Sequence, residues 1–361
     1  MRRQFGETLE RYSKITKEEL KPKSERIDPK VDLQQALDWE IAQERQYSKT
    51  PKQSQEQIVE LQRRKQRVMR WLKRELAVLD DPDGKPEHSS NAITVEQEGD
   101  VFYYNDNRAS KGQQRKGMTL GDLLTDGDWG NVYFLNPATV SYSVRKQFLI
   151  EEAKRRIWEL FDKQVFIEEE TSERTPDRPK EILGKMRQER ESGVEKSGHI
   201  LERIVRNYFR KMAINHELPF EVMPADTHQD VRQAIDFILH RDMRHRGVGV
   251  NEEDRADIGI QLTSNVDPEV LAKKHNVISH ALRRMDERDP VADIVLVAMP
   301  FKESAGRLLS RWKNEGRPPG GPDRYWDSDT KIELFYKVLD GFATQQELRE
   351  WSKQVHQPES P

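Results

Sequence analysis

Three runs decide the fold: QAIDFILHR over 233–241, DIGIQLTS over 257–264 and ADIVLVAMP over 292–300. Each run is short and rich in Ile, Leu, Val or Phe, which are residues that favour β-strands. The last run is apolar at every position from Ile294 to Met299. That pattern is expected of a strand that is buried on both faces of a sheet lying between helices. The three runs therefore predict the centre of a β-sheet.

An amphipathic helix is predicted upstream of these runs, at 197–214. Its sequence, SGHILERIVRNYFRKMAI, repeats apolar residues at helical spacing. The residues expected to face a core are Ile200, Ile204, Val205, Tyr208 and Met212.

The order of the elements indicates the fold class. A further apolar run, FEVMPA, follows the helix, and the segment 267–285 has helical spacing before the last run. The order helix, strand, strand, strand, helix, strand predicts an α/β/α core over 198–300, with a mixed central sheet of about four strands. The chain as a whole is expected to be α+β and helix-rich.

These residues resemble the PD-(D/E)xK nucleases, whose restriction-endonuclease-like fold has the same element order. The family carries an acid on the first helix, an Asp on the second strand and an acid-x-lysine pair on the third. Glu202 matches the helix acid, and Asp236 matches the strand Asp. Gln261 stands at the second acid, where the family accepts Gln, and Thr263 stands at the lysine. The chain also resembles bacterial proteins of unassigned activity that share the IDF and IQ-x-T strings.

The resemblance implies metal-dependent hydrolysis of phosphodiester bonds in DNA or RNA, with Mg²⁺ or Mn²⁺ as the cofactor. Mg²⁺ prefers oxygen ligands and keeps several waters. Asp236, the side-chain carbonyl of Gln261 and a backbone carbonyl near Leu262 would hold one ion. Glu202 would hold a second ion or an outer-shell water.

The family lysine positions the attacking water and stabilises negative charge. Thr263 cannot do this, because a hydroxyl carries no positive charge. Lys273 or Lys274, on the helix after the third strand, would reach the site instead. The expected catalytic residues are Glu202, Asp236, Gln261, Thr263 and Lys273.

Some of these acids have plain structural alternatives. Asp230 is either a further metal ligand or the cap of a helix or turn in the THQD segment. Glu202 has the spacing to pair with Arg206 one turn along its helix. Asp236 is the strongest candidate, because a carboxylate in an apolar strand must find a cation or hydrogen-bond donors.

A basic loop, HRDMRHRGVGV, joins the second and third strands. Arg241, Arg244 and Arg246 in this loop are expected to contact nucleic-acid phosphates. A plain solvated hairpin loop is an equally good interpretation. The two histidines of the loop have no spacing that specifies zinc.

The N-terminal half is expected to be mainly helical, with a helical hairpin over 32–79 and a small β-hairpin near 93–105. Its second helix repeats Arg63, Arg67 and Arg70 at helical spacing. A solvated face is favoured there over a phosphate-binding stripe. The expected organisation is a mobile tail (1–31), a helical region (32–167), a charged linker (168–197), the nuclease-like core (198–300) and a helical C-terminal extension (301–361).

Composition limits the classes of function. The chain has 361 residues, of which 34% are hydrophobic and 35% are charged, with no cysteine and a net charge of −3. Disulfides and cysteine-ligated metals are excluded. The net charge gives no overall positive potential that would indicate nucleic-acid binding. The lack of a long apolar segment or a signal peptide predicts a cytoplasmic protein without a membrane partner.

Three hypotheses follow. The first is a metal-dependent nuclease whose partner is nucleic acid. The second is a nuclease-like module that has lost its lysine and binds nucleic acid or a protein without cutting. The third is a helical interaction scaffold. A homodimer is compatible with each of them.

Overall fold

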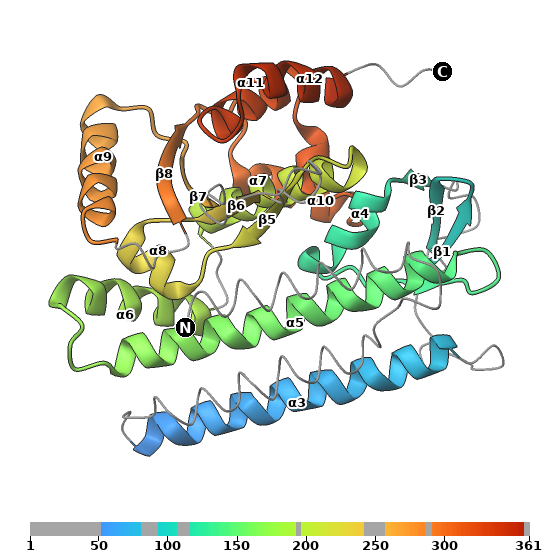
Figure 1. Cartoon of the computed structure of the whole chain (residues 1–361), viewed down its shortest axis with the longest axis horizontal. Coiled ribbons are helices and arrows are strands. Elements are labelled where there is room, and N and C mark those ends of the chain that lie inside the picture. Colours follow the sequence, from blue (N-terminus) through green and yellow to red (C-terminus); the bar gives the residue numbers. More distant parts are fainter. Residues whose placement is uncertain are drawn as a thin grey trace, which may run out of the picture. The chain divides into compact units, whose positions relative to one another are not determined.

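The computed structural model describes residues 52–80, 93–106, 116–192, 196–241, 257–285 and 291–356 (Figure 1). The chain divides into two compact units. The first contains Met1–Met118 and Gly130–Thr175, and the second contains Thr119–Trp129 and Pro176–Pro361. The boundary at Thr175 falls inside the segment that was expected to be a linker.

Two long helices pack together in the first unit: α3 (Lys52–Asp80) and α5 (Tyr142–Thr171). Apolar residues recur every three or four positions on each helix, so that one stripe of each is buried against the other. The buried residues of this cluster are Met69, Leu72, Leu76, Ile150, Ala153 and Ile157. The second arm of the predicted helical hairpin is therefore present, and it packs on α5. The predicted first arm lies outside the described residues.

The predicted β-hairpin is also present. β1 (Ile93–Glu98) and β2 (Val101–Asp106) pair antiparallel around a turn at Gly99. The sheet has two further strands, β3 (Lys116–Met118) beside β2 and β4 (Phe134–Leu135) parallel to β1. These strands of three and two residues are too short to show an alternating pattern in the sequence.

The second unit contains a four-stranded mixed sheet in the order β5-β6-β7-β8. The three neighbouring pairs are antiparallel, antiparallel and parallel. The strands are β5 (Phe220–Pro224), β6 (Phe237–Arg241), β7 (Asp257–Thr263) and β8 (Val291–Ala298). As predicted, a helix, α7 (Ser197–Asn215), precedes the sheet, and α9 (Pro268–Leu282) connects β7 to β8. A short helix between β5 and β6, α8 (Thr227–Gln233), was not predicted.

Helices cover both faces of this sheet. Ile258, Ile260 and Leu262 of β7 belong to one core cluster, together with all five residues predicted to face a core from α7. Ile238 and Ile294 lie in a second cluster, with apolar residues of α9. In Figure 1, α9 lies on one side of β8, and α7 and α10 (Ala305–Asn314) lie on the other. Successive side chains of a strand point to opposite faces of the sheet, so the sheet separates these two core clusters.

The strand buried along its whole length is β7, not β8. Every residue of β7 is buried, whereas Val295, Leu296 and Ala298 of β8 are only partly buried. The expected burial of the last strand is met in part, since no residue from Ile294 to Met299 is exposed although β8 forms an edge of the sheet. An apolar run identifies a strand but carries no information about its position in the sheet.

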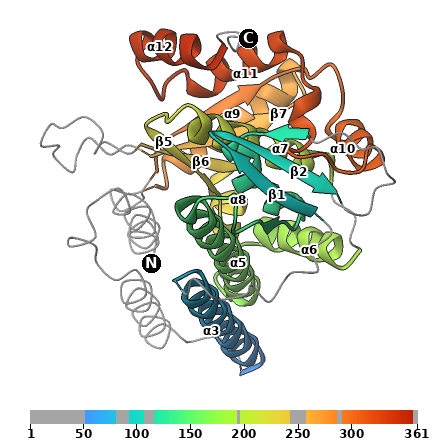
Figure 2. The same cartoon turned by 90° about the vertical axis from the view of Figure 1, so that its right-hand side faces the viewer.

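The C-terminal segment, which was expected to be a helical extension, is helical and contributes to the core. Trp312 of α10 is buried with Leu334, Phe335 and Val338 of α11 (Ser328–Leu339). In both Figure 1 and Figure 2, α12 (Gln345–His356) lies beside α11. The described residues contain no helix that combines the length and apolarity needed to cross a membrane.

Helix also occupies most of the segment that was expected to be a charged linker. α5 continues to Thr171, and α6 spans Asp177–Ser192. Charged side chains four residues apart support such helices, as in the Glu181–Lys185 pair at 2.7 Å. High charge here marks solvated helix rather than irregular chain.

A buried ionic cluster around Lys211 of α7 ties distant segments of the second unit together. The Lys211 ammonium donates to Oδ2 of Asp323 at 2.6 Å and to the carbonyl of Gly320. Asp122 of α4 (Leu120–Thr125) lies 3.5 Å from the same ammonium. Asp126 in turn accepts the Gly320 N–H at 2.9 Å. These bonds explain why Thr119–Trp129 belongs to the second unit.

Candidate functional site

Asp236 is held against β7 by two hydrogen bonds. The chain leaves α8 through Ala234, whose φ of 55° and ψ of 43° are left-handed, and so turns toward β6. The Asp236 N–H donates to the carbonyl of Ile260 at 2.8 Å. Its Oδ2 accepts the N–H of Leu262 at 2.6 Å. The carboxylate therefore has a fixed position at the start of β6.

A glycine in β7 permits this close approach. A Cβ added to Gly259 would lie 2.8 Å from a side-chain carbon of Ile235, the residue that precedes Asp236. Real Cβ atoms essentially never come so close. Gly259 thus makes room for the segment that carries the carboxylate.

Gln261 is the neighbour of Asp236 across the sheet. The antiparallel register pairs Phe237 with Ile260, so that Asp236 and Gln261 are the next residues along it. The Gln261 side chain is buried, and its Oε1 has no hydrogen-bond donor among the described residues. An unpaired buried carbonyl is unfavourable by about 1 to 3 kcal/mol, so this oxygen fits a site that holds a cation or water.

Lys274 is the lysine that reaches this position. Its Nζ lies 3.4 Å from the carbonyl oxygen of Leu262, the residue whose N–H binds Asp236. Lys273, which was expected to serve as the catalytic lysine, is exposed and has no recorded bond to these residues. Adjacent residues on a helix point about 100° apart, so only one of the two lysines can face the sheet.

Three carboxylates act on one another at this end of the sheet. Burial raises the pKa of Asp236 well above its usual value, and the negative charges of Glu202 and Asp230 raise it further. The Leu262 N–H and the charge of Lys274 oppose this rise in pKa. Ionised Asp236 is therefore unfavourable in the chain alone and would be favoured by a further positive charge.

Glu202 also takes part in ion pairs on α7. Its carboxylate lies 3.7 Å from Arg206, as the spacing suggested, and 3.5 Å from Nδ1 of His199. Glu202 therefore pairs with Arg206, and its charge also raises the pKa of Asp236.

The cap of α8 is Asp226, not Asp230. Asp226 Oδ1 accepts the N–H of Gln229 at 2.8 Å, and the Gln229 side chain bonds back to the Asp226 N–H. Asp230 lies in the first turn of α8, where its charge acts on Asp236. A capping role therefore does not account for Asp230.

His199 was not anticipated from the sequence. Its ring lies between Glu202 of α7 and Glu189 of α6, at 3.5 and 3.6 Å. A hydrogen bond to Glu202 raises the pKa of His199, burial opposes the rise, and the charges of Glu202, Asp230 and Asp236 add to it. Its place three residues before Glu202 on a helix was the only available signal.

Thr263, at the lysine position of the family pattern, serves a turn. Its hydroxyl accepts the N–H of Asn265 at 3.2 Å at the end of β7. No positive charge comes from this position.

The predicted basic loop is only partly described. Arg244 and Arg246 lie outside the described residues. Arg241 donates to Glu347 at 2.5 Å and to the carbonyl of Phe342 at 3.2 Å. Its charge is balanced by a contact with the C-terminal segment.

The arginines of α3 are balanced in the same way. Three of them surround Glu60, which lies 4.0 Å from Arg63, 3.2 Å from Arg64 and 3.0 Å from Arg67. Hydrogen bonds from Arg67 and Arg64 lower the pKa of Glu60. These contacts agree with the solvated face favoured from the sequence.

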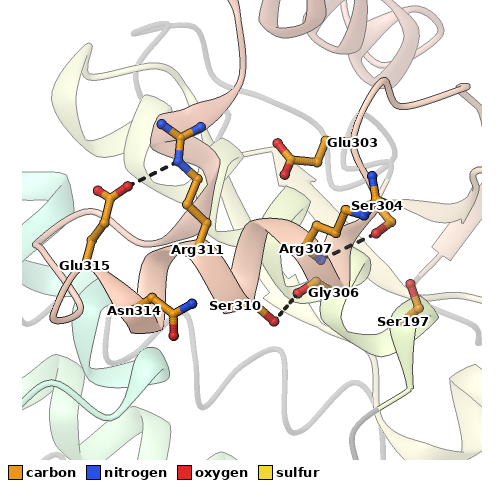
Figure 3. Close-up of a pocket in the computed structure, with 9 residues that line it drawn as sticks. All are labelled: Ser197, Glu303, Ser304, Gly306, Arg307, Ser310, Arg311, Asn314 and Glu315. Carbon is orange, nitrogen blue, oxygen red and sulfur yellow. Dashed lines mark hydrogen bonds and ion pairs between the residues drawn. The ribbon is translucent and has the colours of Figure 1, made fainter.

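A hollow beside α10 is separate from the carboxylates. Figure 3 shows its lining, with Arg311 bonded to Glu315 and Ser310 bonded to the Gly306 carbonyl. It contains Ser197 of α7 and residues of 303–315, but neither Asp236 nor Gln261. Its two acids and two arginines give it no charge preference.

No preformed cluster of three or more His, Asp or Glu side chains suited to a metal ion occurs within the described ranges. The two strongest ligand candidates are of a different kind, since they combine one carboxylate, Asp236, with one amide carbonyl, Gln261. Comparison of the chain with known protein families, with curated proteins and with solved structures finds no match, so the geometry of this site is what supports a function.

Proposed function

We propose that this protein is a metal-dependent nuclease, which hydrolyses phosphodiester bonds of DNA or RNA and has a restriction-endonuclease-like core. The observation that carries the proposal is the position of Lys274, whose ammonium lies 3.4 Å from the carbonyl of Leu262, the residue whose N–H binds Asp236. Lys274 supplies a positive charge that acts on Asp236, although Thr263 replaces the family lysine. The element order of the second unit supports the same proposal.

The residues fit a divalent cation of the Mg²⁺ type. The unpaired Oε1 of Gln261 and the carboxylate of Asp236 are hard oxygen donors on neighbouring strands. Glu202 and Asp230 add negative charge that a cation would offset. A bound Mg²⁺ or Mn²⁺ would supply activation of a water and neutralisation of phosphate charge.

The chain's own groups have separate tasks in this proposal. Asp236 and Gln261 bind the cation, and the Leu262 N–H fixes the orientation of Asp236. Lys274 places a positive charge beside the phosphate, where negative charge increases during the reaction. Glu202 orients an outer-shell water, and Arg206 and His199 hold its carboxylate in place.

Cleavage of labelled single- and double-stranded DNA and RNA with Mg²⁺, Mn²⁺ or EDTA tests the proposal. We expect metal-dependent products from the wild type and none from D236A. D293A is the matched control, because Asp293 is an exposed aspartate of the same sheet. Equal cleavage by D236A and D293A would refute the assignment of the site.

A second function is favoured by one specific observation. Thr263 occupies the lysine position and its hydroxyl is engaged in a turn. A module that binds nucleic acid or a protein partner without cutting would leave this position without a charge. Salt-dependent binding of nucleic acid with no cleavage in either metal would support this second function.

A further inference from the structure

The basic side chains of α9 lie on two sides of the helix, one toward the sheet and one toward solvent. Lys274 points toward the sheet, where it meets the Leu262 carbonyl. Ile278 and Ala281 are buried in the core cluster that covers this side of the sheet. The helix is therefore docked by one face, and the remaining face is open to solvent.

The solvent-facing side is basic. Lys273 and His280 are exposed, as are Arg283 and Arg284 at the end of the helix. At about 100° per residue, these four positions fall on one face. The only acid within α9 is Glu269, in its first turn.

The cations of this face have no acidic partner among the residues that the structure describes. Within the described residues, no carboxylate pairs with Lys273, Arg283 or Arg284, and the recorded bond of Arg283 goes to the carbonyl of Ser279 at 3.1 Å. Other cationic helices differ in this respect. On α3, Arg64 and Arg67 both bond to Glu60.

Cations that lie along one face and lack an acidic partner among the described residues suit a polyanion with evenly spaced charges. Lys273 and Arg284 are separated by a rise of about 16 Å on a helix, which matches about five nucleotides at about 3.4 Å each. A small anion would need a concave site with converging donors, whereas this face is convex and its donors are spread along an axis. The spacing therefore favours a nucleic-acid backbone.

We propose that the outer face of α9 binds the phosphate backbone of the nucleic acid and leads it toward Lys274. This inference rests on the proposed nuclease function for the identity of the ligand. It also assigns one helix two tasks, with Lys274 at the site of reaction and Lys273, Arg283 and Arg284 along the strand that approaches it.

The test is fluorescence anisotropy with labelled DNA and RNA of about 20 nucleotides, in EDTA, over a range of salt concentrations. We expect R283Q/R284Q to weaken binding about tenfold at low salt. The slope of log K against log salt should fall in magnitude by about 1.4 to 1.8, since each lost phosphate contact contributes about 0.7 to 0.9. K273Q should show about half of that change in slope.

The matched control is R64Q/R67Q, which removes the same charge from arginines that are already paired with Glu60. We expect its affinity to stay within about twofold of the wild type. Thermal unfolding of each variant checks that it is folded. Binding of R283Q/R284Q at the wild-type level, an equal loss in both double variants, or no binding by the wild type would overturn the proposal.

Binding in EDTA does not depend on cleavage, so the two proposals fail separately. Loss of binding in R283Q/R284Q, together with no cleavage by the wild type, would support nucleic-acid binding by the outer face of α9 and reject the nuclease activity. Cleavage by the wild type, together with unchanged binding by R283Q/R284Q, would support the nuclease activity and reject nucleic-acid binding by the outer face of α9.

Discussion

Two ionic clusters of the second unit differ in how their charges are satisfied. At Lys211, an ammonium touches a carboxylate directly, with 2.6 Å to Asp323, and joins three segments of chain. At Asp236, the nearby ammonium of Lys274 bonds to a carbonyl, and the carboxylates of Glu202 and Asp230 raise the pKa of Asp236. The first cluster contains a direct ion pair and the second does not, although each leaves one buried oxygen without a donor among the described residues, Oδ1 of Asp323 and Oε1 of Gln261.

The difference separates a structural role from a binding role. A buried ion pair that closes on itself holds elements together, and removal of one partner leaves the other charge buried. A cluster with excess negative charge reduces stability until a cation binds to it, and such perturbed groups concentrate at functional sites. The comparison predicts opposite consequences for substitutions in the two clusters.

The largest effect on stability is expected for K211M. The substitution leaves Asp323 buried without its ammonium, so that the free energy of unfolding should fall by about 3 to 5 kcal/mol. Urea unfolding followed by circular dichroism measures this change. A loss below about 1 kcal/mol, which is the range of a surface ion pair, would show that this cluster does not stabilise the fold.

D236N should have the opposite profile. It removes a charge that Glu202 and Asp230 disfavour, so the free energy of unfolding should stay the same or rise. Cleavage should fall by on the order of 10²- to 10³-fold, because the amide is a poor metal ligand. Both measurements are made on one preparation of D236N. A D236N protein that is less stable than the wild type and still cleaves at the wild-type rate would contradict the comparison.

K274A should lower kcat by on the order of 10²-fold, because its ammonium is the one beside the site. K273A should instead raise KM for a polymeric substrate, since Lys273 is exposed on the outer face of α9. Steady-state cleavage kinetics of both variants separate these outcomes. Rescue of kcat by K274R would indicate that the positive charge, rather than packing, is required.

The smallest effect is a dependence of stability on pH. Since burial and neighbouring charge raise the pKa of Asp236, the folded chain binds this proton more tightly than the unfolded chain. Stability in EDTA should therefore be greatest below the ordinary aspartate pKa and fall as the pH rises through the raised one. One proton contributes at most about 1.4 kcal/mol per pH unit.

Urea unfolding of the wild type and D236N over that interval measures the slope. D236N should lose this contribution, and Mg²⁺ should stabilise the wild type more strongly as the pH rises. Identical slopes for the two proteins would show that Asp236 does not titrate as described.

Much of the second unit was predictable because local patterns report local structure. The helical spacing of α7 identified its buried face, and the apolar runs located β5 to β8 in the right order. The carboxylate at Asp236 was recognisable since an acid among Ile and Phe is unusual. These features depend on neighbours a few residues apart in the chain.

Other features depend on which segments meet, and no local pattern records that. The edge position of β8, the pairing of α3 with α5 and the contribution of α10 to the core follow from long-range packing. Lys211 likewise contacts Asp122, which precedes it, and Asp323, which follows it, and both are far from it in the sequence.

The candidate site shows the same division. The sequence by itself determined that a strand carries Gln261, that a helix carries Glu202 and that Asp236 adjoins another strand, because residue type and periodicity are written in the chain. Only the tertiary structure decided that Lys274 rather than Lys273 faces the sheet, and that His199 joins Glu202. The rotation of a helix about its axis is determined by the core on which it packs, and that core is assembled from segments far apart in the sequence.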